Sequence, residues 1–279
     1  MISYFKILRP INIFILTICF HLTNLILNEN FLNHLSILLV ICILAGFSNT
    51  LNDIIDHKID LANNIKRPIT QNKISIRSAK MFAILLFLLC LIITYFSSFS
   101  SLTNFLIFSI CFPLIIMYTP IFKKIPLVGN IVVSFLISMT FIIFSVSISG
   151  FIPALMMPII IFSFLITLIR EIVKDIQDFN GDELYHINSL PVKYGIKYSI
   201  NIILVLSIVL LCFSIGFFFL FEKYDVIYLS MILLLVHFPL FYHLIKLYKN
   251  KSSTYCIYLS KVLKLITVFG VIVIYLITI

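Results

Sequence analysis

Two acidic clusters with the same spacing are the residues of this sequence most suited to chemistry. Each follows the pattern D-x-x-D-x-x-x-D, and their members are Asp53, Asp56, Asp60, Asp175, Asp178 and Asp182. At 3.6 residues per turn, Asn52, Asp56 and Asp60 lie on one face of a helix, and Asp53 lies beside Asp56. The three aspartates of the second cluster share a face in the same way.

Carboxylates at this spacing repel one another, so we expect a cation between them. Oxygen ligands favour Mg²⁺ or Ca²⁺, and Mg²⁺ is commonly shared between a few carboxylates and substrate phosphates. The bases nearby are Lys66, Arg67, Lys123 and Lys174. One such cluster at a membrane border is commonly only a solvated charged face. Two clusters of the same pattern favour a metal-bridged diphosphate site.

The elements that must position these clusters are apolar. Of the 279 residues, 62% are hydrophobic and only 11% are charged, which excludes a soluble enzyme, a coiled coil, a disordered chain and a disulfide-stapled secreted domain. We predict an all-α, polytopic membrane protein with about nine transmembrane helices in a single domain, residues 1–279. The apolar segments are 10–28, 32–52, 79–97, 101–119, 129–148, 151–170, 199–220, 226–245 and 257–278.

The basic residues predict the orientation. If the nine segments all span, nineteen of the twenty Lys and Arg residues fall on one side and only Lys223 on the other, so the N-terminus is expected in the cytoplasm. The same asymmetry explains the net charge of +9 without nucleic acid. The first apolar segment is expected to be retained as a helix, because it is long and further spans follow it. Four spans separate the acidic clusters, so both should lie at the cytoplasmic surface of a multi-pass protein of the cell membrane.

A diphosphate site at a membrane border fits a polyprenyl diphosphate, whose head lies at the interface and whose chain lies in the hydrocarbon. The 28 Phe and 13 Tyr residues could supply aromatic walls that stabilise an allylic carbocation. Mg²⁺ and basic side chains could stabilise the departing diphosphate. A single aromatic residue in a span is more often lipid-facing, so no Phe is assigned a catalytic role.

At these motifs the chain resembles the UbiA superfamily of intramembrane prenyltransferases. The matching stretches, in the family's order, are LRPIN, NTLNDIIDHKID with KRP after it, YTPIFKK with GN after it, and REIVKDIQDFNGD with SLPVKYG after it. The resemblance implies a bundle of nine transmembrane helices that binds Mg²⁺ and a prenyl diphosphate at the two motifs. Ser189 departs from the family, in which Thr usually precedes Leu-Pro.

Carried over position by position, the resemblance implies metal ligands, diphosphate contacts and catalytic residues. The metal ligands are Asn52, Asp53, Asp56, Asp60, Asp175, Asp178 and Asp182, with Asp53 supporting the first group. The diphosphate or substrate contacts are Arg9, Asn52, Lys66, Arg67, Tyr118 and, less directly, Lys174. The residues expected to carry catalysis are Asp56, Asp60, Asp178, Asp182 and Lys123. Arg170 and Glu171 could instead form a structural ion pair.

The predicted function is therefore Mg²⁺-dependent transfer of a polyprenyl group from an allylic diphosphate to a membrane-associated acceptor. The sequences of the two motifs are most similar to those of the branch that alkylates geranylgeranylglyceryl phosphate, so a prenylglyceryl phosphate lipid is the first choice of acceptor. An aromatic quinone precursor is the alternative. From another class, a divalent-cation carrier is disfavoured, because a carrier should place ionisable groups near the bilayer midplane. The general base, the prenyl chain length and the oligomeric state are not predicted.

Overall fold

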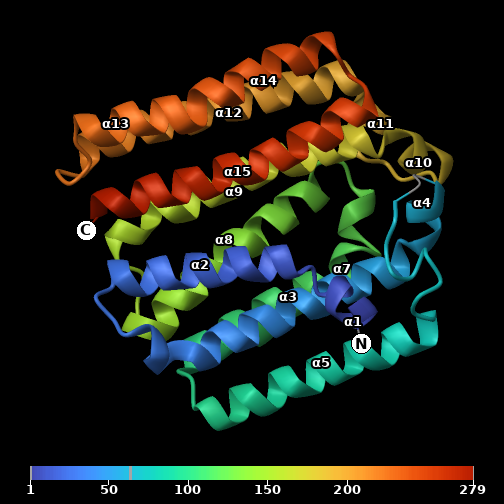
Figure 1. Ribbon diagram of the computed structural model, residues 1–279, viewed down its shortest axis with the longest axis horizontal. Coiled ribbons are helices and arrows are strands. Elements are labelled where there is room, and N and C mark those ends of the chain that lie inside the picture. Colours follow the sequence, from blue (N-terminus) through green and yellow to red (C-terminus); the bar gives the residue numbers. More distant parts are fainter. Residues whose placement is uncertain (1, 63–64, 279) are drawn as a thin grey trace. The chain divides into compact units, whose positions relative to one another are not determined.

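The computed structural model describes residues 2–62 and 65–278, which form helices joined by loops, with no strand in these ranges (Figure 1). The chain divides into two compact units, Met1–Phe122 with Thr140–Ile152, and Lys123–Met139 with Pro153–Ile279. The predicted all-α fold is confirmed. The prediction of a single domain over residues 1–279 stays a prediction.

The first unit carries the first acidic motif at the end of α3 and on α4. Its elements are α1 (Ile2–Ile7), α2 (Pro10–Ile26), η1 (Phe31–His34), α3 (Leu35–Ile55), α4 (His57–Ala62), α5 (Ile76–Ser97), α6 (Ser101–Asn104), η2 (Phe105–Cys111) and α7 (Phe112–Tyr118). The turn η3 (Phe122–Lys124) and then α8 (Val128–Ser149) follow, and each has residues in both units.

The second unit carries the second acidic motif at the end of α9. Its remaining elements are η4 (Ala154–Met156), α9 (Met157–Gln177), α10 (Phe179–Leu184), α11 (Leu190–Tyr194), α12 (Ile196–Leu220), α13 (Val226–Ile232), η5 (Leu233–His237), α14 (Phe238–Lys249) and α15 (Ser253–Thr278). The order of elements is thus similar in the two series: a motif helix, a short helix, a long span, a span in three pieces and another long span, with α11 as an additional short helix in the second.

Eight helical segments in the described ranges are long and apolar enough to cross a membrane. The shorter helix α2 has 17 residues, which at 1.5 Å per residue is about 26 Å and close to the lower limit for a span. The structure therefore agrees with a polytopic membrane protein of about nine helices. The orientation of the termini stays a prediction.

Local sequence signals explain where several helices begin and why two spans are irregular. The side chains of Ser75, Ser100 and Asp225 each accept a hydrogen bond from a backbone N–H in the first turn of the helix that follows. Two spans contain a π-helical turn directly before a Phe-Pro pair. There the N–H of Phe112 donates to the carbonyl oxygen five residues earlier, as does that of Phe238.

Two glycines allow close packing, one in each unit. A Cβ atom on Gly46 of α3 would lie 2.5 Å from Cδ2 of Leu8, so the glycine lets the α1–α2 linker rest on α3. A Cβ atom on Gly270 of α15 would lie 2.0 Å from Cζ of Phe162 on α9. Helix α9 packs against both α15 and α12 and belongs to the most deeply buried of the eight spans found in the described ranges. Both motif helices are therefore held by close contacts within their own units.

Candidate active site

The first acidic motif lies where the long helix α3 gives way to the short helix α4. Asp56 lies between the two helices, with φ −82° and ψ 1°. Its N–H nevertheless donates to the carbonyl of Asn52 at 2.8 Å, and the N–H of Asp60 donates to the carbonyl of Asp56 at 2.8 Å. The spacing of four residues is thus kept through the break, with the carboxylates of Asp53, Asp56 and Asp60 buried.

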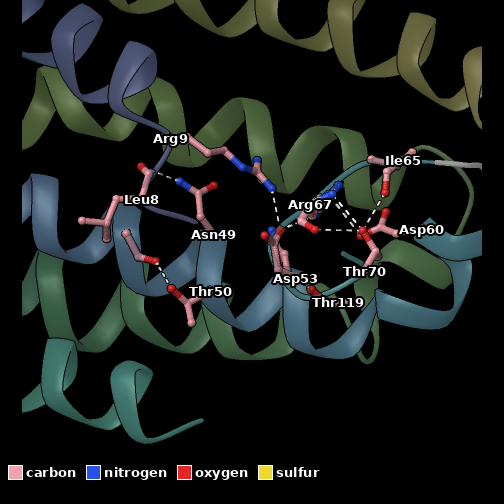
Figure 2. Close-up of polar contacts among 12 residues, drawn as sticks. Leu8, Arg9, Asn49, Thr50, Asp53, Asp60, Ile65, Arg67, Thr70 and Thr119 are labelled. Atoms are coloured by element: carbon pink, nitrogen blue, oxygen red, sulfur yellow. Dashed lines mark hydrogen bonds and ion pairs between the residues drawn. The ribbon is translucent and has the colours of Figure 1, made fainter. Parts of the chain in front are cut away.

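Asp53 holds two arginines. Its Oδ1 accepts a hydrogen bond from Nη2 of Arg9 at 3.0 Å and a second, short one from Nη1 of Arg67, as Figure 2 shows. Arg67 also places its Nε 3.1 Å from Oδ2 of Asp60. Burial opposes the charge of Arg67, but Asp53, Asp60 and Asp56 outweigh it and raise the pKa of the guanidinium above its ordinary value. The structure therefore joins four of the predicted site residues in one ion-pair network.

The backbone brings both arginines to this point. Arg9 precedes α2 in the left-handed conformation, with φ 56°, and Pro10 begins the helix. A left-handed non-glycine residue is strained by about 1 kcal/mol. Arg67 lies in a loop that is tied together by the hydroxyl of Thr70, which accepts from the Arg67 N–H and donates to the carbonyl of Ile65 (Figure 2). Lys66, the neighbouring predicted contact, is exposed.

The side chain of Asn52 is held by a residue that the sequence analysis did not select. The hydroxyl of Thr119 donates to Oδ1 of Asn52 at 2.5 Å, and the two residues are 67 positions apart. Thr119 is buried and directly follows α7. Its neighbour Tyr118, a predicted substrate contact, is the half-buried last residue of α7, and Lys123 is half-buried in the turn η3.

The second acidic motif has the same local geometry as the first. Asp178 lies between α9 and α10 with φ −93° and ψ 7°. Its N–H donates to the carbonyl of Lys174 at 2.9 Å, and the N–H of Asp182 donates to the carbonyl of Asp178 at 3.0 Å. Asp175 accepts a hydrogen bond of 2.8 Å at Oδ2 from Nδ2 of Asn130 on α8.

Lys174 and Arg170 both form ion pairs with Glu171. The Nζ of Lys174 lies 2.7 Å from Oε2 of Glu171, and Nη1 of Arg170 lies 3.3 Å from Oε1. Glu171 is buried, so its charge needs such partners. This geometry supports the structural ion pair that the sequence analysis had left open.

The oxygen donors of the motifs suit Mg²⁺, which takes part of its coordination shell from substrate and water, better than they suit a metal whose ligands all come from the protein. In residues 2–62 and 65–278, no group of three His, Cys, Asp or Glu side chains is placed to hold a metal ion. Mg²⁺ commonly binds through one or two carboxylates and completes its shell with substrate phosphates and water. Asn52, Asp56 and Asp60 supply oxygen donors of that kind, whereas one oxygen of Asp53 is already shared by two guanidinium groups.

Two supporting residues, Thr119 and Asn130, were therefore missed. Both lie within stretches that had been noted, Thr119 in YTPIFKK and Asn130 in the Gly-Asn pair, but neither was selected as a site residue. A polar residue at the edge of an apolar span is the signal that could have found Asn130. No spacing rule relates either residue to its aspartate motif, because each contact depends on how helices pack.

Comparison with known proteins agrees with this geometry. Residues 13–268 match the model of the UbiA prenyltransferase family. The digeranylgeranylglyceryl phosphate synthase of Methanosphaera stadtmanae is 31% identical over 237 residues, covering 83% of each chain. The synthase of the same name from Methanobrevibacter smithii is 30% identical over 264 residues, covering 94% of this chain and 92% of that protein.

Solved structures share the fold along nearly the whole chain. A structure described as digeranylgeranylglyceryl phosphate synthase in membranes matches with a TM-score of 0.75 and 25% identity, covering 99% of this chain and 97% of that one. A UbiA homologue from Archaeoglobus fulgidus, bound to DMAPP and Mg²⁺, matches with a TM-score of 0.68 and 18% identity, covering 98% and 99%. The family match, the relatives and the two aspartate motifs lead to one conclusion: the chain belongs to the UbiA family and is a membrane-embedded prenyltransferase.

Proposed function

We propose that this prenyltransferase uses Mg²⁺ to transfer a polyprenyl group from an allylic prenyl diphosphate to a prenylglyceryl phosphate lipid, and that its two motifs act on the same diphosphate. The observation that carries the proposal is the shared geometry of the motifs. In each, a spanning helix ends before the second aspartate, and the third aspartate follows on a short helix in unbroken backbone register.

We assign Asn52, Asp56 and Asp60 to one Mg²⁺ ion, and Asp178 and Asp182, supported by Asp175, to another. The bound Mg²⁺ would neutralise charge on the diphosphate and so make it a better leaving group. The carboxylates could not do this without a cation, because they repel a leaving diphosphate, which carries several negative charges.

Asp53 has a different role in this proposal. A buried carboxylate that accepts from two guanidinium groups keeps Arg9 and Arg67 side by side, although like charges repel. Both guanidiniums remain partly exposed, at 35% for Arg9 and 23% for Arg67, so an approaching anion can reach them. Planar guanidinium groups bind phosphate oxygens in pairs. We therefore assign the two arginines to the diphosphate, with Lys66, Tyr118 and Lys123 as further contacts.

The reaction has a simple balance. The allylic C–O bond breaks with its electron pair left on the diphosphate, where the arginines stabilise the charge. The acceptor hydroxyl oxygen attacks the allylic carbon and loses its proton to a base that is not assigned. We assign Lys174 to structure, because Glu171 already holds its ammonium group.

The choice of acceptor rests on the relatives. The relatives from Methanosphaera stadtmanae and Methanobrevibacter smithii, which cover most of the chain at 31% and 30% identity, bear the name digeranylgeranylglyceryl phosphate synthase. The prediction that both motifs face the cytoplasm rests on the basic residues, nineteen of which fall on the side of the motifs.

The test uses the full chain in membranes or detergent with radiolabelled geranylgeranyl diphosphate and a panel of acceptors. We expect label to enter the glyceryl phosphate lipid, with the product identified by mass spectrometry. EDTA should stop transfer and added Mg²⁺ should restore it. Transfer only to an aromatic acceptor such as 4-hydroxybenzoate would overturn the acceptor assignment, and transfer undiminished in EDTA would overturn the role of the metal.

A further inference from the structure

The hydrogen bond made by Thr119 differs from those of five threonines in the spanning helices. A helical threonine commonly donates to the carbonyl of its own preceding turn. Five do so here, each to the residue four positions earlier: Thr17, Thr23, Thr50, Thr94 and Thr267. The hydroxyl of Thr119 instead reaches a side chain on another helix, Oδ1 of Asn52.

The position of Thr119 allows this. It follows the last residue of α7 with helical backbone angles, φ −70° and ψ −43°, and Pro120 comes next. Helix α7 packs against α3, and Thr119 is only 4% exposed. Within the ranges that the structure describes, this is the one hydrogen bond made by the side chain of Asn52, so Thr119 determines the orientation of that amide.

The chemistry of the pair gives the bond a consequence. An asparagine amide has an oxygen end that accepts and a nitrogen end that donates, and only the oxygen end can bind a cation. A hydroxyl that donates to Oδ1 holds this oxygen in place, and its second lone pair remains available. We propose that Thr119 is a positioning residue: it orients the Asn52 carbonyl oxygen as a ligand for the divalent cation.

This inference rests on the proposed metal role of Asn52 and adds a residue that does not touch the metal itself. Groups that orient a metal ligand commonly change metal affinity by about 10- to 100-fold when they are removed. The readout is therefore the binding of a cation, which can be measured without catalysis.

The experiment titrates Mn²⁺ into the purified full chain in the presence of inorganic diphosphate and follows free Mn²⁺ by electron paramagnetic resonance. Thr119→Val replaces the hydroxyl by a methyl group of similar size, and Thr119→Ser keeps the hydroxyl. Thr50→Val is the matched control, because Thr50 is buried on the same helix as Asn52 but donates to the carbonyl of Gly46. Thermal unfolding of each variant reports on its fold.

We expect Thr119→Val to weaken Mn²⁺ binding about 10- to 100-fold, while Thr119→Ser and Thr50→Val bind as the wild type does. Wild-type affinity in Thr119→Val would overturn the proposal and leave the prenyl transfer reaction untouched. If Thr119→Val does not fold, the serine variant still decides, since a loss of affinity with the hydroxyl present contradicts the proposal. Absence of Mn²⁺ binding by the wild type would instead overturn the proposed metal role and this inference with it.

Discussion

Arg9 and Asp53 are 44 residues apart in the sequence, and Nη2 of Arg9 lies 3.0 Å from Oδ1 of Asp53. Arg67 donates to the same oxygen. One carboxylate thus brings together two guanidiniums from two separate segments, the linker before α2 and the loop after α4. The first aspartate of the motif therefore differs in its surroundings from Asp56 and Asp60.

Replacing Asp53 by Asn should weaken the binding of the prenyl diphosphate. The amide cannot balance the charge of Arg9 and Arg67, so the two guanidiniums should move apart. Hydrogen bonds to charged groups contribute about 1.5–3 kcal/mol, so we expect KM for the prenyl diphosphate to rise by about 10- to 100-fold. Steady-state kinetics with varied diphosphate concentration measures the change.

The control for this variant is Asp225→Asn, the same chemical change at a helix cap. Asp225 accepts from the N–H of Tyr228, and an asparagine can do the same. Its KM should equal that of the wild type. An unchanged KM in Asp53→Asn, with the fold intact, would show that the arginines do not depend on Asp53 for their positions.

Replacing Gly46 by Val should disturb the site from a distance. A Cβ atom at this position already lies 2.5 Å from Leu8, the residue before Arg9, and valine adds two methyl groups. The Leu8 side chain must move, and because Leu8 directly precedes Arg9, we expect the linker to shift and the contact between Arg9 and Asp53 to weaken. We expect KM for the diphosphate to rise, but by less than in Arg9→Ala, because the end of a flexible leucine side chain can give way at a small cost.

A second change should reverse this effect. Leu8→Ala removes the atom in conflict, so the double variant should recover most of the affinity. Gly216→Ala on α12 is the matched control, since nothing lies within 4 Å of its added Cβ atom. Failure of Leu8→Ala to improve the Gly46→Val protein would contradict the mechanism.

The spans could be predicted from the sequence because apolar runs of about 20 residues have few alternatives. The segment 101–119, for example, corresponds to the helical run Ser101–Tyr118. The apolar segment 151–170 corresponds to the helical run Ala154–Gln177, which continues into the second acidic motif, as the helical spacing of its aspartates predicts. Beyond its apolar part, helix α9 contains Glu171 and Asp175, and side chains of the same unit pair with both. A hydropathy profile cannot detect such partners.

The acidic motifs could also be predicted, because their spacing is local. Their partners could not. Thr119 and Asn52 are 67 positions apart, and Asn130 and Asp175 are 45 apart, so each pair depends on helix packing. The break in the helix at Asp56 was missed for a related reason: the i, i+4 spacing assumes a straight helix, and the sequence around Asp56 has no Gly or Pro to end it.

Replacing Asn130 should slow prenyl transfer by acting on Asp175 of the second motif. A substitution that adds a negative charge should slow it more than one that only removes the hydrogen bond. Asn130→Ala removes the donor to Asp175, and Asn130→Asp also places a like charge within hydrogen-bonding distance of it. We expect transfer to fall by about 10-fold in the alanine variant and further in the aspartate variant, following the loss of about 1–2 kcal/mol for one hydrogen bond. Single-turnover rates measure both.

Ser134→Ala is the control for these variants, because Ser134 lies one turn further along α8 and donates to the carbonyl of Asn130 rather than to an aspartate. It should keep wild-type rates. Equal rates in Asn130→Ala and Asn130→Asp would mean that a negative charge at position 130 does not change the contribution of Asp175 to prenyl transfer.

The last prediction concerns whether the two motifs act as one unit. Asp56→Ala and Asp178→Ala remove the residue at the helix break in each motif. If both motifs hold one diphosphate, either change alone should cost most of the catalysis, at least about 100-fold, and the double variant should be little slower than either single one. Residues that act together show this strong non-additivity.

Independent sites would behave differently, since the two losses of activation free energy would then add and the double variant would be slower by the product of the single effects. The measurement is the rate of label transfer under saturating diphosphate in all four proteins, with thermal unfolding to confirm the fold. Multiplicative losses would separate the motifs into two functions. A double variant that transfers label at the rate of the single variants would support one diphosphate bound by both motifs through their metal ions. The matching geometry of the two motifs leads us to expect this arrangement.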